Sequence, residues 1–386
     1  MKAYCLNNIS KVALNTLKAP NEIVENIEDA NCILVRSAKM HEMDLDKNIL
    51  AVARAGAGVN NIPLEKYAEN GIVVFNTPGA NANAVKELVL CGLLLSCRDV
   101  IGGIKYIEEN TTDEEIAAHA EKAKAKYAGF EVKGKTIAVI GLGVIGVLVA
   151  NACINLGMKV IGYDPYLSIQ NAMSLSKEVK YVEKIEEAIK EADFVTIHVP
   201  LNDSTKYMFN EKTFNNFKDN TILLNFSRDK LVNDNDLLNA INNKKVSKYV
   251  TDFANPDVVK LPNTICLPHL GASTEEAEDN CAIMAIEELD DYIKNGNIKN
   301  SVNYPNCDMG LRGENTRVTV MHRNIPNMIG QFTTILAEGQ INIHNMTNKS
   351  RNEYAYSILD VEGNVSDTVV EKLSKIDGVL RVRVIA

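Results

Sequence analysis

The stretch Thr136-Ile137-Ala138-Val139-Ile140-Gly141-Leu142-Gly143-Val144-Ile145-Gly146 decides the fold of this chain. Five mostly β-branched residues predict a buried strand, and the Gly-x-Gly-x-x-Gly turn then opens an apolar helix. Gly141 permits a tight turn, Gly143 lets the backbone approach a pyrophosphate, and Gly146 allows the helix to pack closely on the strand. The stretch predicts a dinucleotide site, with a ligand-free glycine-rich helix start as the alternative.

Asp164 adds a cofactor preference to this prediction. It ends the strand that follows the glycine turn, 18 residues beyond Gly146. A carboxylate at this place accepts hydrogen bonds from ribose hydroxyls and repels a 2′-phosphate. The sequence therefore favours NAD over NADP.

Length and composition limit the remaining possibilities. A chain of 386 residues predicts two or three domains, and a net charge of −9 argues against general nucleic-acid or anionic-membrane binding. Eight cysteines without a Cys-x-x-Cys pair indicate reduced thiols of a cytoplasmic protein. No signal peptide is expected. The apolar stretch 88–104 is broken by Arg98 and Asp99, so we expect a buried helix, roughly 83–108, and no membrane span.

Two series of strands alternate with helical segments along the chain, a rhythm that predicts two doubly wound parallel sheets. Segment 110–126 is expected to be a solvated helix or connector, and a helix over 275–294 could return to the first domain. The expected strands of the first series are 32–35, 51–55 and 72–75, and those of the second are 136–140, 159–163, 194–199, 221–225, 249–252 and 264–267.

The tail after residue 305 has a different pattern. Strands are expected at 316–321, 341–348, 354–361 and 380–385, with helices near 326–338 and 366–376. This order, βαββαβ, predicts a ferredoxin-like module.

Oxidation of a secondary alcohol needs a base for the hydroxyl proton, a cation for an adjacent carboxylate and an acid that holds the base. Arg228, Asp252 and His269 follow successive strands of the second series, and strand ends of such sheets carry the ligand site. We expect His269 to be the base and Arg228 the carboxylate clamp. Of the other histidines, His41 and His119 are expected to be solvated and His198 to be structural or part of the cofactor wall.

At these residues the chain resembles the D-2-hydroxyacid dehydrogenases over essentially its whole length. The resemblance implies a substrate-binding domain at 1–96 and 282–305, an NAD-binding Rossmann domain at 97–281 and a regulatory domain at 314–386. It rests on the glycine turn and on Val35-Arg36-Ser37-Ala38, Arg54-Ala55-Gly56-Ala57-Gly58-Val59-Asn60-Asn61, Asn76-Thr77-Pro78, Gly162-Tyr163-Asp164-Pro165, Leu224-Asn225-Phe226-Ser227-Arg228 and Pro268-His269-Leu270-Gly271-Ala272-Ser273-Thr274.

The same resemblance assigns roles to individual residues. Arg228 and His269 would be catalytic, with Asn255 at the position of the usual orienting acid, and Lys124 or Lys126 could also reach the site. Residues implied in cofactor binding are Thr77, Gly141, Gly143, Val144, Ile145, Gly146, Asp164, Val199, Pro200, Phe226, Ser227, Arg228, Asp252, His269 and Gly271. Residues implied in substrate binding are Arg36, Ser37, Lys39, Arg54, Gly56, Ala57, Gly58 and Asn76, of which Arg36, Lys39 and Arg54 form a phosphate-binding edge.

Two positions depart from the family pattern. Asp229 stands where a glycine usually follows the catalytic arginine, and Asn255 stands where a glutamate usually orients the histidine. Asparagine accepts a hydrogen bond but cannot stabilise an imidazolium by charge, so the pH range of activity should shift unless another acid replaces the glutamate. Asp257 is the first candidate for that acid and Asp252 the second.

The tail resembles an ACT domain of the kind that binds L-serine. His322, Asn324 and Asn342 match the effector positions, while Asn327 replaces a glycine, a change that asparagine tolerates because it adopts positive φ better than most residues. The alternative is a module that only dimerises. A homodimer or homotetramer is expected.

The resemblance implies NAD-dependent oxidation of 3-phospho-D-glycerate to 3-phosphohydroxypyruvate, the first step of L-serine biosynthesis, with feedback by L-serine. Another D-2-hydroxyacid dehydrogenase, such as a hydroxypyruvate or glyoxylate reductase, is the first alternative. A non-catalytic NAD-binding amino-acid sensor is the second, suggested only by Asn255.

Overall fold

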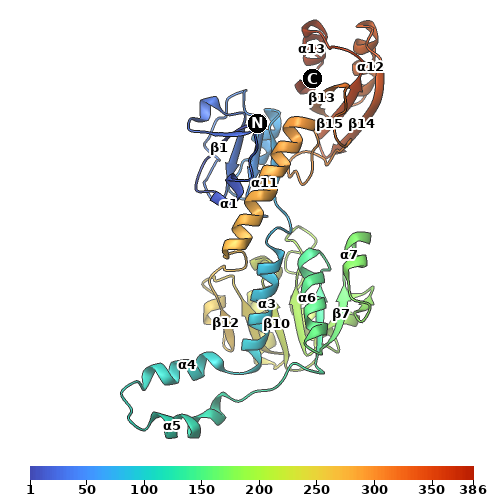
Figure 1. Ribbon diagram of the computed structural model, residues 1–386. Helices are drawn as coiled ribbons and strands as arrows, with labels where there is room; N and C mark the ends of the chain where they lie inside the picture. The colour runs from blue at the N-terminus through green and yellow to red at the C-terminus, as the bar shows by residue number, and fades with distance from the viewer. The chain divides into compact units, whose positions relative to one another are not determined.

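The computed structural model describes all residues from 1 to 386 and contains two compact units (Figure 1). The first comprises Met1–Asn81 and Glu275–Ala386, and the second comprises Ala82–Thr274. None of the helices is both long and apolar enough to cross a membrane.

The second unit is built on a seven-stranded parallel sheet in the order β12-β11-β10-β9-β6-β7-β8. The strand order reverses between β6 and β9, and the glycine turn follows β6 at that point, where open α/β sheets bind their ligands. The three-residue edge strand β8 was not predicted. The strands are β6 (Thr136–Ile140), β7 (Lys159–Tyr163), β8 (Lys180–Val182), β9 (Phe194–Ile197), β10 (Thr221–Asn225), β11 (Val246–Thr251) and β12 (Thr264–Cys266).

Helices cover both faces of this sheet, which confirms the doubly wound prediction. On one face α3 (Ala82–Cys97) and α6 (Val144–Asn155) pack together over the sheet (Figure 1). The other face packs against α8 (Ile185–Ile189), α9 (Glu211–Asn215) and α10 (Asp234–Asn242). The remaining helices of the unit are α4 (Val100–Glu109), α5 (Ile116–Ala123), α7 (Ile169–Ser174) and the 3₁₀ turns η2 (Lys124–Tyr127), η3 (Asp229–Leu231) and η4 (Val258–Lys260).

The prediction of one buried helix over 83–108 is wrong. The helix ends at Cys97, and Asp99 starts a second helix by accepting a hydrogen bond from the Gly102 N–H at 3.0 Å. Helix α4 has no buried residue. The solvated helix expected within 110–126 is confirmed as α5.

The N-terminal sheet of the first unit is parallel, in the order β2-β1-β3-β4-β5, a flavodoxin-like arrangement. Helix α11 packs on this sheet, so the segment after residue 274 does return to the first domain. Strands β1 and β2 were not predicted. The elements are β1 (Lys2–Cys5), α1 (Lys11–Leu14), β2 (Glu22–Val24), η1 (Ile27–Asp29), β3 (Cys32–Val35), β4 (Ala51–Arg54), α2 (Leu64–Glu69), β5 (Val73–Asn76) and α11 (Glu275–Asn295).

The tail forms a four-stranded antiparallel sheet in the order β14-β15-β13-β16, with helices α12 (Met328–Glu338) and α13 (Asp367–Ser374) against one face. This confirms the ferredoxin-like βαββαβ module. Its strands are β13 (Thr316–Arg323), β14 (Ile343–Arg351), β15 (Tyr354–Val361) and β16 (Val379–Ile385).

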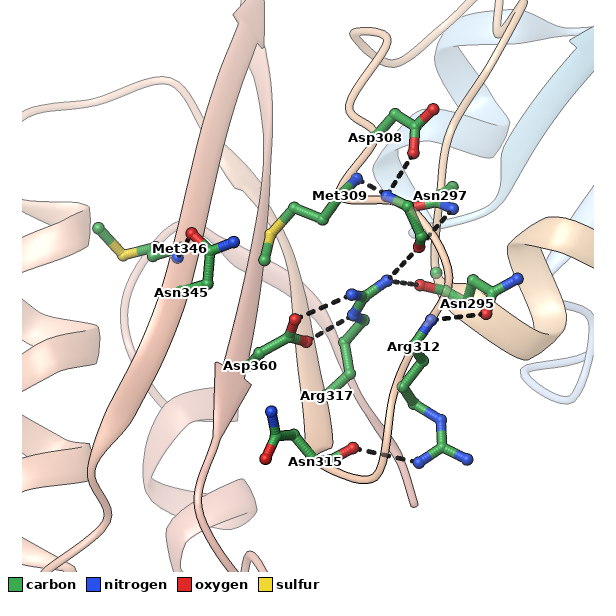
Figure 2. A network of polar contacts seen from close by, with 12 residues as sticks. Asn295, Asn297, Asp308, Met309, Arg312, Asn315, Arg317, Asn345, Met346 and Asp360 are labelled. Carbon is green, nitrogen blue, oxygen red and sulfur yellow. Dashed lines mark hydrogen bonds and ion pairs between the residues drawn. The ribbon is translucent and has the colours of Figure 1, made fainter.

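Two arginines of the tail sheet hold the C-terminus of α11, and Figure 2 shows the first of them, Arg317. The buried guanidinium of Arg317 makes two hydrogen bonds to Asp360, of 2.6 and 2.9 Å, and donates to the carbonyl of Asn295 at 2.7 Å. Arg383 donates to the carbonyls of Tyr292 and Ile293 at 3.4 and 3.2 Å. The last carbonyls of a helix have no intrahelical partner, so these contacts both cap α11 and attach the tail to it.

Candidate active site

The glycine turn after β6 needs its glycines for three different reasons. Gly141 has φ of 96°, and a Cβ there would lie 2.5 Å from the His198 carbonyl oxygen. A Cβ on Gly146 would lie 1.9 Å from the Gly141 carbonyl oxygen, so helix and turn could not close with any larger residue. At Gly143 a Cβ would meet nothing within 4 Å. That open space is where a pyrophosphate can approach the backbone.

The start of α6 suits the phosphates of a dinucleotide. No side chain caps its N-terminus, and Val144 in its first turn is 51% exposed. The N–H groups at such a helix start carry partial positive charge and bind anions. The residues present therefore fit an NAD pyrophosphate.

Asp164 lies directly beside the turn. One carboxylate oxygen accepts from the Leu142 N–H at 2.8 Å and the other from the Tyr166 N–H at 2.8 Å. These bonds fix the carboxylate at the end of β7, and each oxygen keeps a second lone pair for a ribose hydroxyl.

The ends of β9 and β10 form the neighbouring part of the site. The Ser227 hydroxyl donates to the Val199 carbonyl at 2.6 Å, which joins the segments that follow the two strands. The Phe226 ring is buried against Gly92 of α3. Pro200 follows Val199 at the same edge. Burial lowers the pKa of His198 to about 3, and its Nε2 lies 2.9 Å from the Thr196 hydroxyl, as expected of a neutral wall residue.

Arg228 and His269 both follow strands at the carboxyl edge of the sheet. Arg228 is exposed beyond β10, and its Nη1 donates to the Ser227 carbonyl at 2.6 Å. His269 is exposed beyond β12, and its ring packs on Phe253 with a centroid distance of 4.8 Å. Sequence reasoning missed Phe253, although its place right after Asp252 could have indicated it.

Asp252 is the carboxylate that faces His269 within the second unit. Its side chain is buried, and one oxygen accepts from the Gly271 N–H at 3.1 Å while the other has no hydrogen-bond partner. Burial raises the pKa of Asp252, and the charge of the nearby His269 opposes that rise. A buried carboxylate with a free oxygen is costly unless a ligand or a cation compensates it.

Asn255 holds a turn. Its Nδ2 donates to Asp229 at 2.9 Å and to Asp234 at 3.0 Å, and its Oδ1 accepts from the Asp257 and Val258 N–H groups at 2.9 and 2.8 Å. All four hydrogen-bonding positions of the amide are therefore used away from the imidazole. The Asp257 carboxylate is exposed and lies 4.0 Å from the Lys260 ammonium.

The predicted substrate residues of the first unit gather at the carboxyl ends of β3, β4 and β5. Arg54 pairs in register with both Val35 and Asn76, so Arg36, Arg54 and Asn76 lie at one edge of the sheet. Lys39 follows in the loop after β3, where Ser37 accepts from Asn7 at 3.3 Å. The Arg36 guanidinium forms an ion pair with Glu278 of α11, which sequence reasoning missed because 242 residues separate the two.

The Gly56-Ala57-Gly58 loop is tied to the segment after β5. The Thr77 hydroxyl accepts from the Gly56 N–H at 2.8 Å, and the Asn76 side chain donates to the Ala57 carbonyl at 2.6 Å. Gly56 has φ of 143°, and a Cβ there would lie 2.4 Å from an Arg54 nitrogen. Lys124 and Lys126 lie in η2 of the second unit, where Lys124 pairs with Glu121.

The three predicted effector residues are not together within one tail module. His322 is buried, with Nδ1 2.8 Å from the Arg323 carbonyl oxygen and Nε2 3.1 Å from the Ser357 hydroxyl, and burial lowers its pKa. Asn324 lies near Tyr354, whereas Asn342 lies near Val361, at the opposite end of β15. Asn327 has φ of 66°, which confirms that asparagine accommodates this turn.

A doubly wound sheet with a glycine turn, an aspartate at the end of the next strand, and an arginine and a histidine after strands at the same edge is the architecture of an NAD-dependent oxidoreductase. Residues 97–271 match the NAD binding domain of the D-isomer specific 2-hydroxyacid dehydrogenases. The chain is 30% identical to D-3-phosphoglycerate dehydrogenase 2 of Saccharomyces cerevisiae, over 95% of this chain and 80% of that protein. It therefore belongs to the D-2-hydroxyacid dehydrogenase family.

Two further proteins extend the comparison. D-3-phosphoglycerate dehydrogenase of Methanocaldococcus jannaschii is 30% identical over 87% of this chain, which spans 63% of the length of that protein. The crystal structure of an NAD⁺-bound 3-phosphoglycerate dehydrogenase of Entamoeba histolytica superposes with a TM-score of 0.59 at 25% identity, over 78% of this chain and 98% of the other. NAD is the cofactor of this fold and site.

Proposed function

We propose that this chain oxidises 3-phospho-D-glycerate to 3-phosphohydroxypyruvate, as the first step of L-serine biosynthesis. The observation that carries the proposal is that Arg228 and His269 both follow strands at the sheet edge that also bears the cofactor turn. Similarity to proteins named D-3-phosphoglycerate dehydrogenase supports the choice of substrate.

In this proposal Arg228 binds the substrate and His269 transfers the proton. Arg228 binds the substrate carboxylate through two parallel N–H···O bonds. His269 takes the proton of the C2 hydroxyl. NAD held by the glycine turn and Asp164 would supply the acceptor for the hydride of C2. The loss of one proton and one hydride turns the alcohol into the ketone.

Asp252 replaces the usual glutamate in this proposal. It is buried, faces His269 and retains an oxygen without a partner, whereas Asp257 lies exposed beside Lys260. A carboxylate near an imidazolium stabilises the protonated ring, which helps His269 to hold the proton it removes.

The phosphate of the substrate would bind at the edge formed by Arg36, Lys39 and Arg54. This edge supplies local positive charge to a chain whose net charge is −9. The ion pair with Glu278 neutralises part of the charge of Arg36, so Lys39 and Arg54 carry more of the attraction.

L-Serine feedback is the regulatory part of the proposal. Asn324 lies beside Glu353 and Asn342 beside Glu362, at opposite ends of one tail sheet. The rise of about 3.3 Å per residue separates these ends by about 30 Å, so one module cannot place both asparagines on one amino acid. A second module related by a two-fold axis can bring its Asn342 to the first module's His322 and Asn324. The proposal therefore requires at least a homodimer. A reducing, cytoplasmic location is supported by the cysteine pattern of the sequence.

One assay tests these claims together. NADH formation by the purified chain is measured with 3-phospho-D-glycerate and with unphosphorylated D-glycerate, each with and without L-serine. Turnover that prefers glycerate would favour another D-2-hydroxyacid dehydrogenase, and no turnover with either substrate would favour an NAD-binding sensor. A rate unaffected by millimolar L-serine would remove the feedback claim alone.

A further inference from the structure

An open cavity of about 380 Å³ lies at the surface of the first unit, beside the end of β5. It is lined by three segments far apart in the sequence: the end of β5, the loop after α11 and the end of β14 in the tail module. The lining residues that matter here are Asn76, Asn300, Ser301, Lys349, Ser350 and Arg351. The volume lies within the usual range of small-molecule sites, about 300–1,000 Å³.

Two cations of the tail module line this cavity without a compensating acid. The Nη1 of Arg351 donates to the Ser301 carbonyl at 2.8 Å, and neither Arg351 nor Lys349 forms an ion pair. Nearby Lys299 differs, because it pairs with Asp291 at 3.0 Å and with Asp308 at 3.1 Å. The positive charge at the cavity is therefore available to bind an anion from solution.

The remaining lining suits a polar anion. Asn76, Asn300 and Asn306 contribute amides, and Ser301 and Ser350 contribute hydroxyls. The carboxyl group that touches this lining is Glu288, whose Oε1 accepts from Asn300 at 2.7 Å. Burial raises the pKa of Glu288 to about 8, so this group adds little negative charge at neutral pH.

We infer that the cavity is a binding site for a small oxyanion, a phosphate or carboxylate group, held by Lys349 and Arg351. Guanidinium and ammonium groups bind such anions through charge-assisted hydrogen bonds, and amide N–H groups complete the shell. The site differs from the one assigned to L-serine, because it lies between the tail and the N-terminal sheet of one chain and contains neither His322 nor Asn342.

Asn76 connects the cavity to the substrate loop. Its side chain donates to the Ala57 carbonyl at 2.6 Å, and its backbone N–H donates to the Asn300 carbonyl at 3.3 Å. An anion that draws the Asn76 amide toward Lys349 competes with the bond to Ala57. Occupancy of the cavity therefore alters the loop that binds the substrate carboxylate. This coupling, unlike the binding itself, rests on the proposed function.

Isothermal titration of the full chain with inorganic phosphate, and separately with succinate, tests the binding. Phosphate can also bind at the edge formed by Arg36, Lys39 and Arg54, so Arg36→Gln is included to identify binding at that edge. The variants are Lys349→Gln, which breaks no hydrogen bond, and Arg351→Gln, with Lys375→Gln as a control because it removes an exposed lysine elsewhere in the tail. Thermal melts establish that each variant is folded.

We expect at least one of the two anions to bind the wild type. Its affinity should fall tenfold or more in Lys349→Gln and in Arg351→Gln. It should be unchanged in Arg36→Gln and Lys375→Gln. The anion that binds should also change the KM for the hydroxy acid in the wild type but not in Lys349→Gln. Binding lost only in Arg36→Gln, or no binding of either anion up to tens of millimolar, overturns the site. Neither result bears on the oxidation assay, which tests the proposed function independently of this site.

Discussion

Asn255 donates a hydrogen bond from Nδ2 to the Asp229 carboxylate at 2.9 Å. The two residues of the second unit that depart from the family pattern are therefore in contact with each other. A second bond from the same nitrogen reaches Asp234, whose pKa is raised by burial and lowered by the hydrogen bond from Asn255. The amide nitrogen bridges the two carboxylates by donating to both, which a glutamate could not do.

Restoring the glutamate should therefore harm the protein. Asn255→Glu places a third carboxylate against Asp229 and Asp234, and we expect a loss of about 1–3 kcal/mol in stability from the broken hydrogen bonds. Adding Asp229→Gly should recover part of that loss by removing one like charge. Thermal melts of both single variants and the double variant measure the coupling, and strictly additive changes would contradict it.

Asp164 should control the choice between NAD and NADP. Asp164→Asn keeps one acceptor oxygen for the two N–H groups of Leu142 and Tyr166 and removes the charge that repels a 2′-phosphate. We expect the ratio of kcat/KM with NAD to that with NADP to fall at least tenfold, which corresponds to about 1.4 kcal/mol. Glu191→Gln, an exposed charge change in the same unit, should leave the ratio unchanged. An unchanged ratio in Asp164→Asn would show that recognition lies elsewhere.

Asp252 and Asp257 form a matched pair for testing the acid beside His269. Asp252→Asn removes the carboxylate that stabilises the imidazolium, so we expect kcat to fall and the acid limb of the pH–rate profile to move to lower pH. Asp257→Asn should change neither, because that carboxylate is exposed beside Lys260. An effect in Asp257→Asn with none in Asp252→Asn would show that Asp257 is the acid that acts on His269.

Glu288 makes stability depend on pH. Burial raises its pKa from 4.5 to about 8, so the neutral form is favoured in the folded chain and stability is lost as pH rises from about 4.5 through 8. Glu288→Gln mimics the neutral acid and should melt at the same temperature as the wild type near pH 5 but several degrees higher at pH 9. Glu287→Gln, an exposed neighbour, is the control, and parallel curves for all three proteins would contradict this account.

Much of the fold was predictable because its signals are local. The run 136–146 combines strand, turn and helix start within eleven residues, and the tail alternates its elements at regular spacing. Strands β1, β2 and β8 escaped prediction because each begins with a charged residue and is partly exposed, so they lack the continuous apolar run of an equally short strand such as β3. The break between α3 and α4 depends on one capping contact, from Gly102 to Asp99.

The site was predictable only in part. Residues at strand ends, such as Arg228, Asp252 and His269, follow from the topology of a parallel sheet. Contacts between segments far apart in the sequence do not follow from that topology. Asn255 meets Asp234 across 21 residues and Arg36 meets Glu278 across 242, and no local pattern indicates either contact.

The most direct test of the central claim is the ratio of kcat/KM for 3-phospho-D-glycerate to that for D-glycerate with NAD, in the wild type and in Arg228→Gln. We predict a ratio well above one in the wild type and a fall of kcat/KM by about a hundredfold or more for both substrates in Arg228→Gln, because the bidentate carboxylate bond is lost. NAD binding should weaken far less than kcat/KM, because the glycine turn and Asp164 are unchanged in that variant. A ratio at or below one, or an Arg228→Gln enzyme as active as the wild type, would contradict the account.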